Sequence, residues 1–137
     1  SSHASYLYIE IIKIKENLMD MIKKPKLWLI VLAVVHTFMG VIGSYVQMGG
    51  GTEYLAMILY FLIISVYLTY AAFMTQGQEQ ARLATVLCAP TVVWFIVSAI
   101  MGLEMMGVPV AEFPSGLLPI TLWSLPAVTG IMNWNSN

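Results

Sequence analysis

Residues 27–47 read LWLIVLAVVHTFMGVIGSYVQ, a run that contains no formally charged side chain. A helix needs about 20 mostly apolar residues to cross the hydrocarbon core of a membrane. Three later segments have the same character, at residues 54–75, 83–103 and 116–134. The last is shorter and is interrupted by Pro119 and Pro126. The pattern predicts an all-α membrane protein built as a four-helix transmembrane bundle.

Composition points to the same class of protein. Of the 137 residues, 59% are hydrophobic and 9% are charged, against roughly 25% charged residues in soluble domains. This excludes a soluble globular enzyme and a disordered segment. The net charge of -1 leaves no basic surface for nucleic acid, so nucleic acid is not an expected partner. The single cysteine excludes an internal disulfide framework.

The basic residues predict the orientation in the membrane, because cytoplasmic loops of membrane proteins are enriched in Lys and Arg. All six lie before the first span or between the second and third: Lys13, Lys15, Lys23, Lys24, Lys26 and Arg82. The opposite loops, 48–53 and 104–115, hold only acidic charges. We therefore expect both termini to be cytoplasmic. The first span is too long for a typical signal peptide, so we expect it to be retained.

Residues 6–24 predict an amphipathic helix. Its polar side chains recur at helical spacing: Glu10, Lys13, Asn17, Asp20 and Lys24. The opposite stripe is apolar: Leu7, Ile11, Ile14, Leu18 and Met21 or Ile22. Either this helix lies on the cytoplasmic leaflet, or it packs against a partner subunit. Pro25 separates it from the first span, which divides the chain into residues 1–25 and a transmembrane domain at 26–137.

His36 is the ionisable residue deepest in a predicted span, about 14 Å from Leu27 by helical rise. Ionisable groups inside a membrane are functional candidates because burying them in lipid is unfavourable. Gly40, Gly43 and Ser44 share its helical face and predict close helix packing there. Three roles remain open for His36: packing as a hydrogen-bonded neutral ring, contact with a ligand or cofactor, and proton transfer.

Aromatic side chains in the other spans are candidates for a pocket around His36, namely Tyr67, Trp94 and Trp123. Such a pocket would suit a flat lipophilic molecule such as a quinone, sterol or pigment. The alternative is that these rings fill the core or form an interfacial belt. Haem is a further candidate, but the only other histidine is His3, outside the spans, so a second ligand would come from a methionine or another chain.

Other chemistry has little support in the sequence. Met101, Glu104, Met105 and Met106 cluster near the end of the third span, and thioethers favour Cu(I). Nothing completes that cluster, so no metal site is predicted. The spans contain no Ser-His-Asp, Cys-His or paired-carboxylate arrangement. The sequence therefore leans against catalysis without deciding it: isomerase or transferase activity in the bilayer stays open, and no catalytic residue is assigned.

The stretch Leu32 to Gly40, LAVVHTFMG, resembles the first span of small bacterial four-helix membrane proteins that carry His-Thr-x-x-Gly and are loosely DoxX-like. The run from Leu117 through Pro126 is similar to their Leu-rich last span, although Ala127 stands where those proteins have a histidine. The family has no settled activity. The resemblance implies the fold, a bacterial inner membrane location and His36 as a candidate residue.

Two functional hypotheses follow from the sequence. The first is a non-catalytic subunit or accessory protein of a larger membrane complex, favoured by the small-residue faces and the amphipathic helix. Its partners would be the lipid bilayer and other membrane subunits or further copies of the chain. The alternative is a self-contained membrane binder or redox component that holds a lipophilic ligand near His36.

Overall fold

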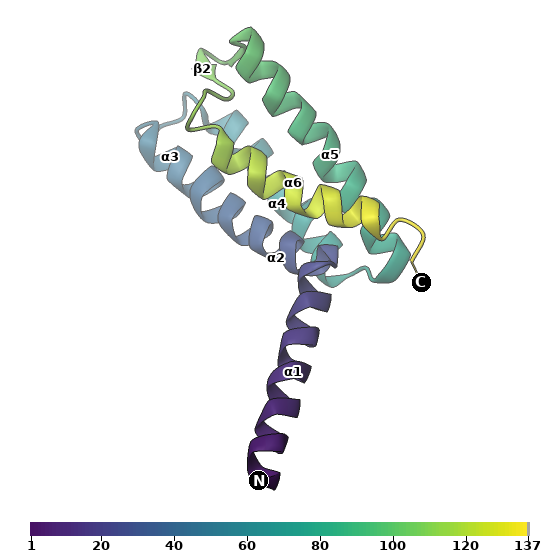
Figure 1. Cartoon of the computed structure of the whole chain (residues 1–137). Coiled ribbons are helices and arrows are strands. Elements are labelled where there is room, and N and C mark those ends of the chain that lie inside the picture. The colour runs from purple at the N-terminus through teal and green to yellow at the C-terminus, as the bar shows by residue number, and fades with distance from the viewer. Residues whose placement is uncertain (137) are drawn as a thin grey trace.

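The structure is a computed structural model that describes residues 1–136. It is almost entirely helical, with one small hairpin near the end opposite to α1 (Figure 1). The elements are α1 (Ser2–Ile22), α2 (Pro25–Val35), the π-helix η1 (His36–Gly43), α3 (Ser44–Gln47), α4 (Leu55–Phe73), α5 (Gly77–Met101), β1 (Glu104–Met105), β2 (Val108–Pro109) and α6 (Leu117–Met132).

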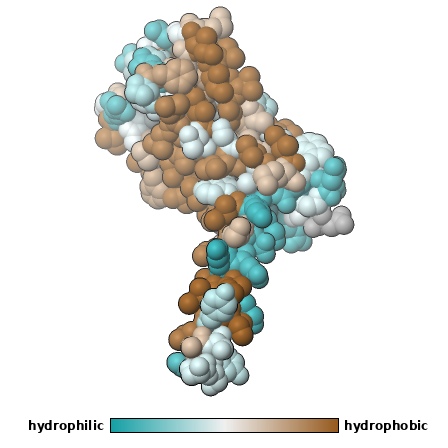
Figure 2. Space-filling model, in the orientation of Figure 1, coloured by the Kyte–Doolittle hydropathy of each residue, from teal (hydrophilic) through white to brown (hydrophobic). Residues whose placement is uncertain are grey.

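Three helical segments are long and apolar enough to cross a membrane: Pro25–Gln47, Leu55–Phe73 and Gly77–Met101. The bundle also carries many large apolar side chains on its outside, and its visible face is mostly hydrophobic (Figure 2). In water, an apolar surface of this extent would drive association, whereas lipid can cover it. These three helices and the apolar surface confirm the prediction of an all-α chain with the helices of an integral membrane protein.

The fourth apolar helix is shorter than predicted. α6 has 16 residues, which corresponds to about 24 Å of helix against a hydrocarbon core of about 30 Å. The predicted segment 116–134 includes Gly116 and Asn133, which flank the helix. Pro126 is nevertheless accommodated inside α6, where it is fully buried.

α5 begins earlier than predicted, because the polar segment 75–82 is not simply a connecting loop. The helix starts at Gly77 and Gln80 is buried in it. The Gln80 side-chain Nε2 donates to the carbonyl oxygens of Ala71 (3.1 Å), Ala72 (3.0 Å) and Thr75 (3.0 Å). These carbonyls belong to the last turn of α4 and the residues after it, where helical partners are missing. A polar sequence therefore forms the first turns of a helix.

The first span is interrupted by a π-helix. Regular α-helical winding ends at Val35, and the wider turns of η1 continue to Gly43. π-Helical turns are rare and are found frequently at functional sites. Because the winding changes at His36, the residues after it are rotated relative to their positions on a continuous α-helix.

The tightest packing of the bundle joins α5 and α6. A Cβ atom placed on Gly130 would lie 2.6 Å from the Ala81 carbonyl oxygen and 2.5 Å from Thr85 Oγ1. The two backbones therefore approach as closely as small residues allow. The buried core extends from α5 and α6 to α2 and α4, and its residues are Leu29, Leu32, Ala33, Leu68, Ala71, Ala72, Ala84, Cys88, Trp123 and Ala127.

α1 stands apart from the bundle (Figure 1). It is helical from Ser2 to Ile22, and none of its residues is buried. The junction with α2 is held by two hydrogen bonds. Trp28 Nε1 donates to the Ile22 carbonyl at 2.7 Å, and Asn133 Nδ2 donates to the Lys23 carbonyl at 2.7 Å. The second bond ties the end of α6 to the residue that follows α1, just before α2 begins.

The close approach of α5 and α6 predicts the effect of a single methyl group. We expect Gly130→Ala to destabilise the folded chain by about 1–3 kcal/mol, because backbone must move to admit the new Cβ. Gly51→Ala is the matched control, since a Cβ there meets nothing within 4 Å. Thermal unfolding of both variants in the same detergent measures the difference. Equal stability of the two variants would contradict this packing.

Candidate functional site

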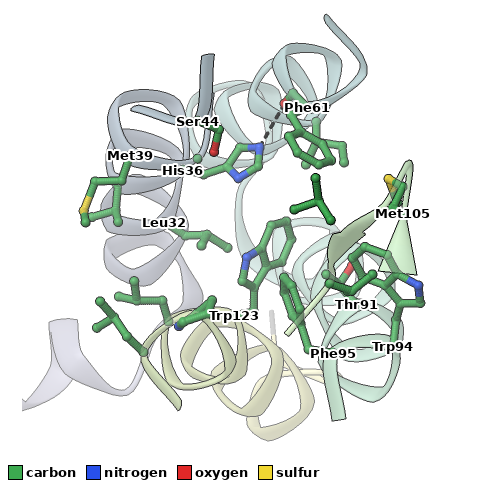
Figure 3. A pocket seen from close by; sticks show the side chains of 18 of the residues that line it. Leu32, His36, Met39, Ser44, Phe61, Thr91, Trp94, Phe95, Met105 and Trp123 are labelled. Atoms are coloured by element: carbon green, nitrogen blue, oxygen red, sulfur yellow. Dashed lines mark hydrogen bonds between the residues drawn. The ribbon is translucent and has the colours of Figure 1, made fainter. Parts of the chain in front are cut away.

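A cavity of about 350 Å³ lies inside the bundle, between the helices and the β1–β2 hairpin (Figure 3). Residues of α2, η1, α3, α4, α5 and α6 line it, together with the hairpin. The volume falls in the range of small-molecule sites. None of the described residues that line the cavity carries a formal charge, so the site is shaped for an apolar occupant.

The hairpin lines the cavity at one end. β1 and β2 pair antiparallel, with Glu104 opposite Pro109 and Met105 opposite Val108. The two residues between them have positive φ angles, 55° for Met106 and 78° for Gly107. A two-residue turn with positive φ at both positions matches the twist of a hairpin. This turn allows Met105 and Val108 to line the cavity.

His36 lies at the first turn of η1 and lines the cavity (Figure 3). Its Nε2 lies 2.9 Å from the carbonyl oxygen of Phe61 on α4. The imidazole also packs edge-on against the ring of Trp123, with centroids 5.6 Å apart and an interplanar angle of 80°. The ring is thus held by two other helices, α4 and α6.

Gly40 makes room for this ring. A Cβ atom at Gly40 would lie 3.0 Å from His36 Nδ1 and 3.5 Å from its Cε1. The sequence predicted that Gly40, Gly43 and Ser44 serve helix packing. In the structure Gly40 and Ser44 line the cavity, and the atom nearest to a Cβ on Gly43 is the Phe38 carbonyl oxygen of the same segment, at 3.3 Å.

The structure brings together three of the four predicted ligand-contacting residues. His36, Trp94 and Trp123 all line the cavity. Tyr67 does not, and 51% of its surface is exposed on the outside of α4. Tyr67 lies six residues after Phe61 in α4, which places it on a different face of that helix.

Several lining residues were not identified from the sequence. Phe61 contributes its carbonyl oxygen and its ring, and Phe95 packs near Trp123 with centroids 6.3 Å apart. Four methionines also line the cavity: Met39, Met48, Met57 and Met105. The high methionine content is the only signal that could have indicated them. Methionine is flexible and polarizable, so a surface built from it adapts to ligands of different shape.

The position of His3 bears on the haem hypothesis. His3 is exposed on α1, outside the bundle. A pair of histidines from one copy of the chain therefore cannot hold a haem in this cavity. Within residues 1–136 no cluster of three or more His, Cys, Asp or Glu side chains is arranged to hold a metal ion.

Comparisons with known proteins leave the site to be interpreted from its own geometry. No protein-family model matches the chain, and searches of curated proteins and of solved structures found no match. The resemblance to DoxX-like proteins therefore stays a prediction.

Proposed function

We propose that this chain is a membrane protein that binds one lipophilic small molecule in the cavity beside His36. The observation that carries the proposal is the cavity itself, about 350 Å³ of space lined by apolar and aromatic side chains with one imidazole. Ligand sites typically combine an apolar lining with a few polar groups that orient the ligand. Of the two hypotheses from the sequence, this geometry favours the self-contained binder.

The lining indicates the shape of the ligand. Trp123 is 5% exposed and presents its ring beside those of His36 and Phe95. Aromatic rings at such distances offer flat surfaces for stacking or edge contacts. A ring-containing molecule of the quinone, sterol or pigment type suits these surfaces better than a charged metabolite, because no charged side chain is available to pair with a charge.

The placement in the membrane is part of the proposal. Arg82 Nε donates to the Trp134 carbonyl at 3.1 Å, and Asn133 contacts Lys23, so basic residues gather at one end of the bundle. The hairpin with Glu104 is at the other end (Figure 1). The positive-inside rule then places both termini in the cytoplasm, α6 as the fourth crossing, and the cavity nearer the outer face. We propose the bacterial inner membrane as the location.

Replacing His36 tests the binding site. We expect His36→Ala to lower occupancy of a co-purifying small molecule by about tenfold, because the ligand loses its polar anchor, while the bundle remains folded. The control is Tyr67→Ala, which removes an aromatic ring outside the cavity. Native mass spectrometry of gently extracted protein measures the bound mass. A wild-type chain that retains no small molecule, or equal retention by both variants, would refute the proposal.

A second candidate function has its own observation in α1. No residue of this helix is buried, and its apolar stripe of Leu7, Ile11, Ile14 and Leu18 is exposed. The accessory-subunit hypothesis assigns this stripe to another membrane subunit or a second copy of the chain. Under this hypothesis the extracted particle has a mass well above the 15.2 kDa of one chain.

A charge placed on the stripe tests this second function. We expect Ile14→Glu to reduce the amount of partner polypeptide that co-purifies by about tenfold or more, because a buried isoleucine contributes about 1.5–3 kcal/mol. Asn17→Glu is the matched control, since it places the same charge on the polar side of α1. Quantitative mass spectrometry of the purified complex compares the two. A wild-type chain that purifies alone as a monomer would rule out the accessory role.

A further inference from the structure

The hydrogen bond to Phe61 determines which nitrogen of His36 carries the proton. Phe61 contributes a carbonyl oxygen, which can only accept. His36 Nε2 must therefore be the donor across the 2.9 Å contact. In a neutral imidazole only one nitrogen carries hydrogen, and its position is assigned from the hydrogen-bond partners. Nδ1 is left as a hydrogen-bond acceptor.

Nδ1 has no hydrogen-bond partner within residues 1–136. It is also accessible, because the only buried side-chain nitrogen or oxygen without a partner in this part of the chain is Ser98 Oγ. Figure 3 shows this second nitrogen on the side of the ring away from Phe61, facing the space between the labelled side chains. Gly40 keeps its surroundings open, since a methyl group there would lie 3.0 Å from Nδ1.

Three other polar groups in the cavity lining also lack partners within the described residues, and one of them is the indole Nε1–H of Trp94. Neither the indole Nε1–H of Trp123 nor the Ser44 hydroxyl makes a hydrogen bond there. The Thr91 hydroxyl, in contrast, donates to the Leu87 carbonyl at 2.8 Å and is occupied by its own helix. The cavity therefore offers an acceptor on His36 and a donor on Trp123, whose ring centres are 5.6 Å apart.

We infer that the ligand is a lipophilic alcohol or phenol whose hydroxyl group donates a hydrogen bond to His36 Nδ1. A hydroxyl donates one hydrogen and accepts through its lone pairs, so the same oxygen can still accept from the Trp123 indole or the Ser44 hydroxyl. A ketone, quinone or ether oxygen only accepts and leaves Nδ1 unpaired in an apolar site, which is unfavourable. This inference rests on the proposed ligand-binding function and narrows it to one chemical class.

Two probes that differ only in the donor test the inference. We use 2-naphthol and its methyl ether, 2-methoxynaphthalene, with the full chain in lipid nanodiscs and with empty nanodiscs to subtract partitioning into lipid. We expect the wild-type protein to bind the naphthol about fivefold more tightly than the ether, the usual effect of one hydrogen bond. In His36→Phe, which keeps a ring without nitrogens, this preference falls to about one while the ether still binds.

Nitrogen NMR on histidine-labelled protein gives a readout that leaves the His36 imidazole intact. The chain has two histidines, and a His3→Gln variant on the exposed α1 assigns the remaining signals to His36. We expect the His36 Nδ1 resonance to shift with 2-naphthol and to stay in place with the ether. Gly40→Ala supplies a second variant that retains the imidazole, and its methyl group beside Nδ1 should reduce the naphthol preference.

The outcomes separate the inference from the function on which it rests. If both probes bind saturably and compete with one another but with equal affinity, the cavity binds lipophilic molecules and the hydroxyl requirement is wrong. A preference for naphthol that persists in both His36→Phe and Gly40→Ala also overturns it, because the donor then pairs elsewhere. If neither probe binds beyond the empty nanodiscs, the proposed binding function fails as well.

Discussion

The contact of α6 with α5 at Gly130 determines how the rest of the bundle packs. Because Gly130 has no side chain, the two helices meet backbone to backbone beside Ala81 and Thr85. At the same end of the bundle, the Gln80 amide donates to carbonyls at the end of α4, and the Asn133 amide donates to the Lys23 carbonyl between α1 and α2. Toward the hairpin, large side chains such as Trp123 and Phe95 separate the helices. A bundle that is tight at one end and filled by bulky rings at the other leaves space between those rings, and this space is the cavity.

The polar groups of the spans explain why His36 is distinct within this cavity. A hydroxyl group in an apolar helix commonly donates a hydrogen bond to the backbone carbonyl four residues earlier. Most of the hydroxyl groups in these helices follow this pattern, including Thr37, Thr69, Thr85, Thr91, Thr121, Ser124 and Thr129. His36 instead bonds to a different helix and uses only one of its two nitrogens to do so. Its remaining capacity for a hydrogen bond is therefore directed at the cavity and not at its own backbone.

Hydropathy was sufficient to locate three apolar spans and to single out His36, because both depend on composition along the chain. Trp94 and Trp123 were also identified, because each is the only large ring with a polar atom near the middle of its predicted span. Tyr67 was expected near His36 but does not line the cavity, because depth in a span does not determine the face of the helix on which a side chain lies. The π-helix changes that rotation inside the first span, and no local pattern predicted it. Gln80 lies before the predicted third span at 83–103, whereas in the structure it belongs to α5 and its amide donates to a carbonyl of α4.

The isolation of α1 has a consequence for conformational entropy. A helix without buried residues is stabilised only by its own hydrogen bonds and by contacts along its surface, whereas helices in proteins gain most of their stability from packing of an amphipathic face. Fixing each backbone residue opposes folding by roughly 1–2 kcal/mol. Any apolar surface that covers the stripe of α1 therefore also shifts its helix–coil equilibrium. Part of the free energy of that contact is offset by the ordering of the chain. The affinity of α1 for the surface that covers it is therefore weaker than the contact area alone indicates.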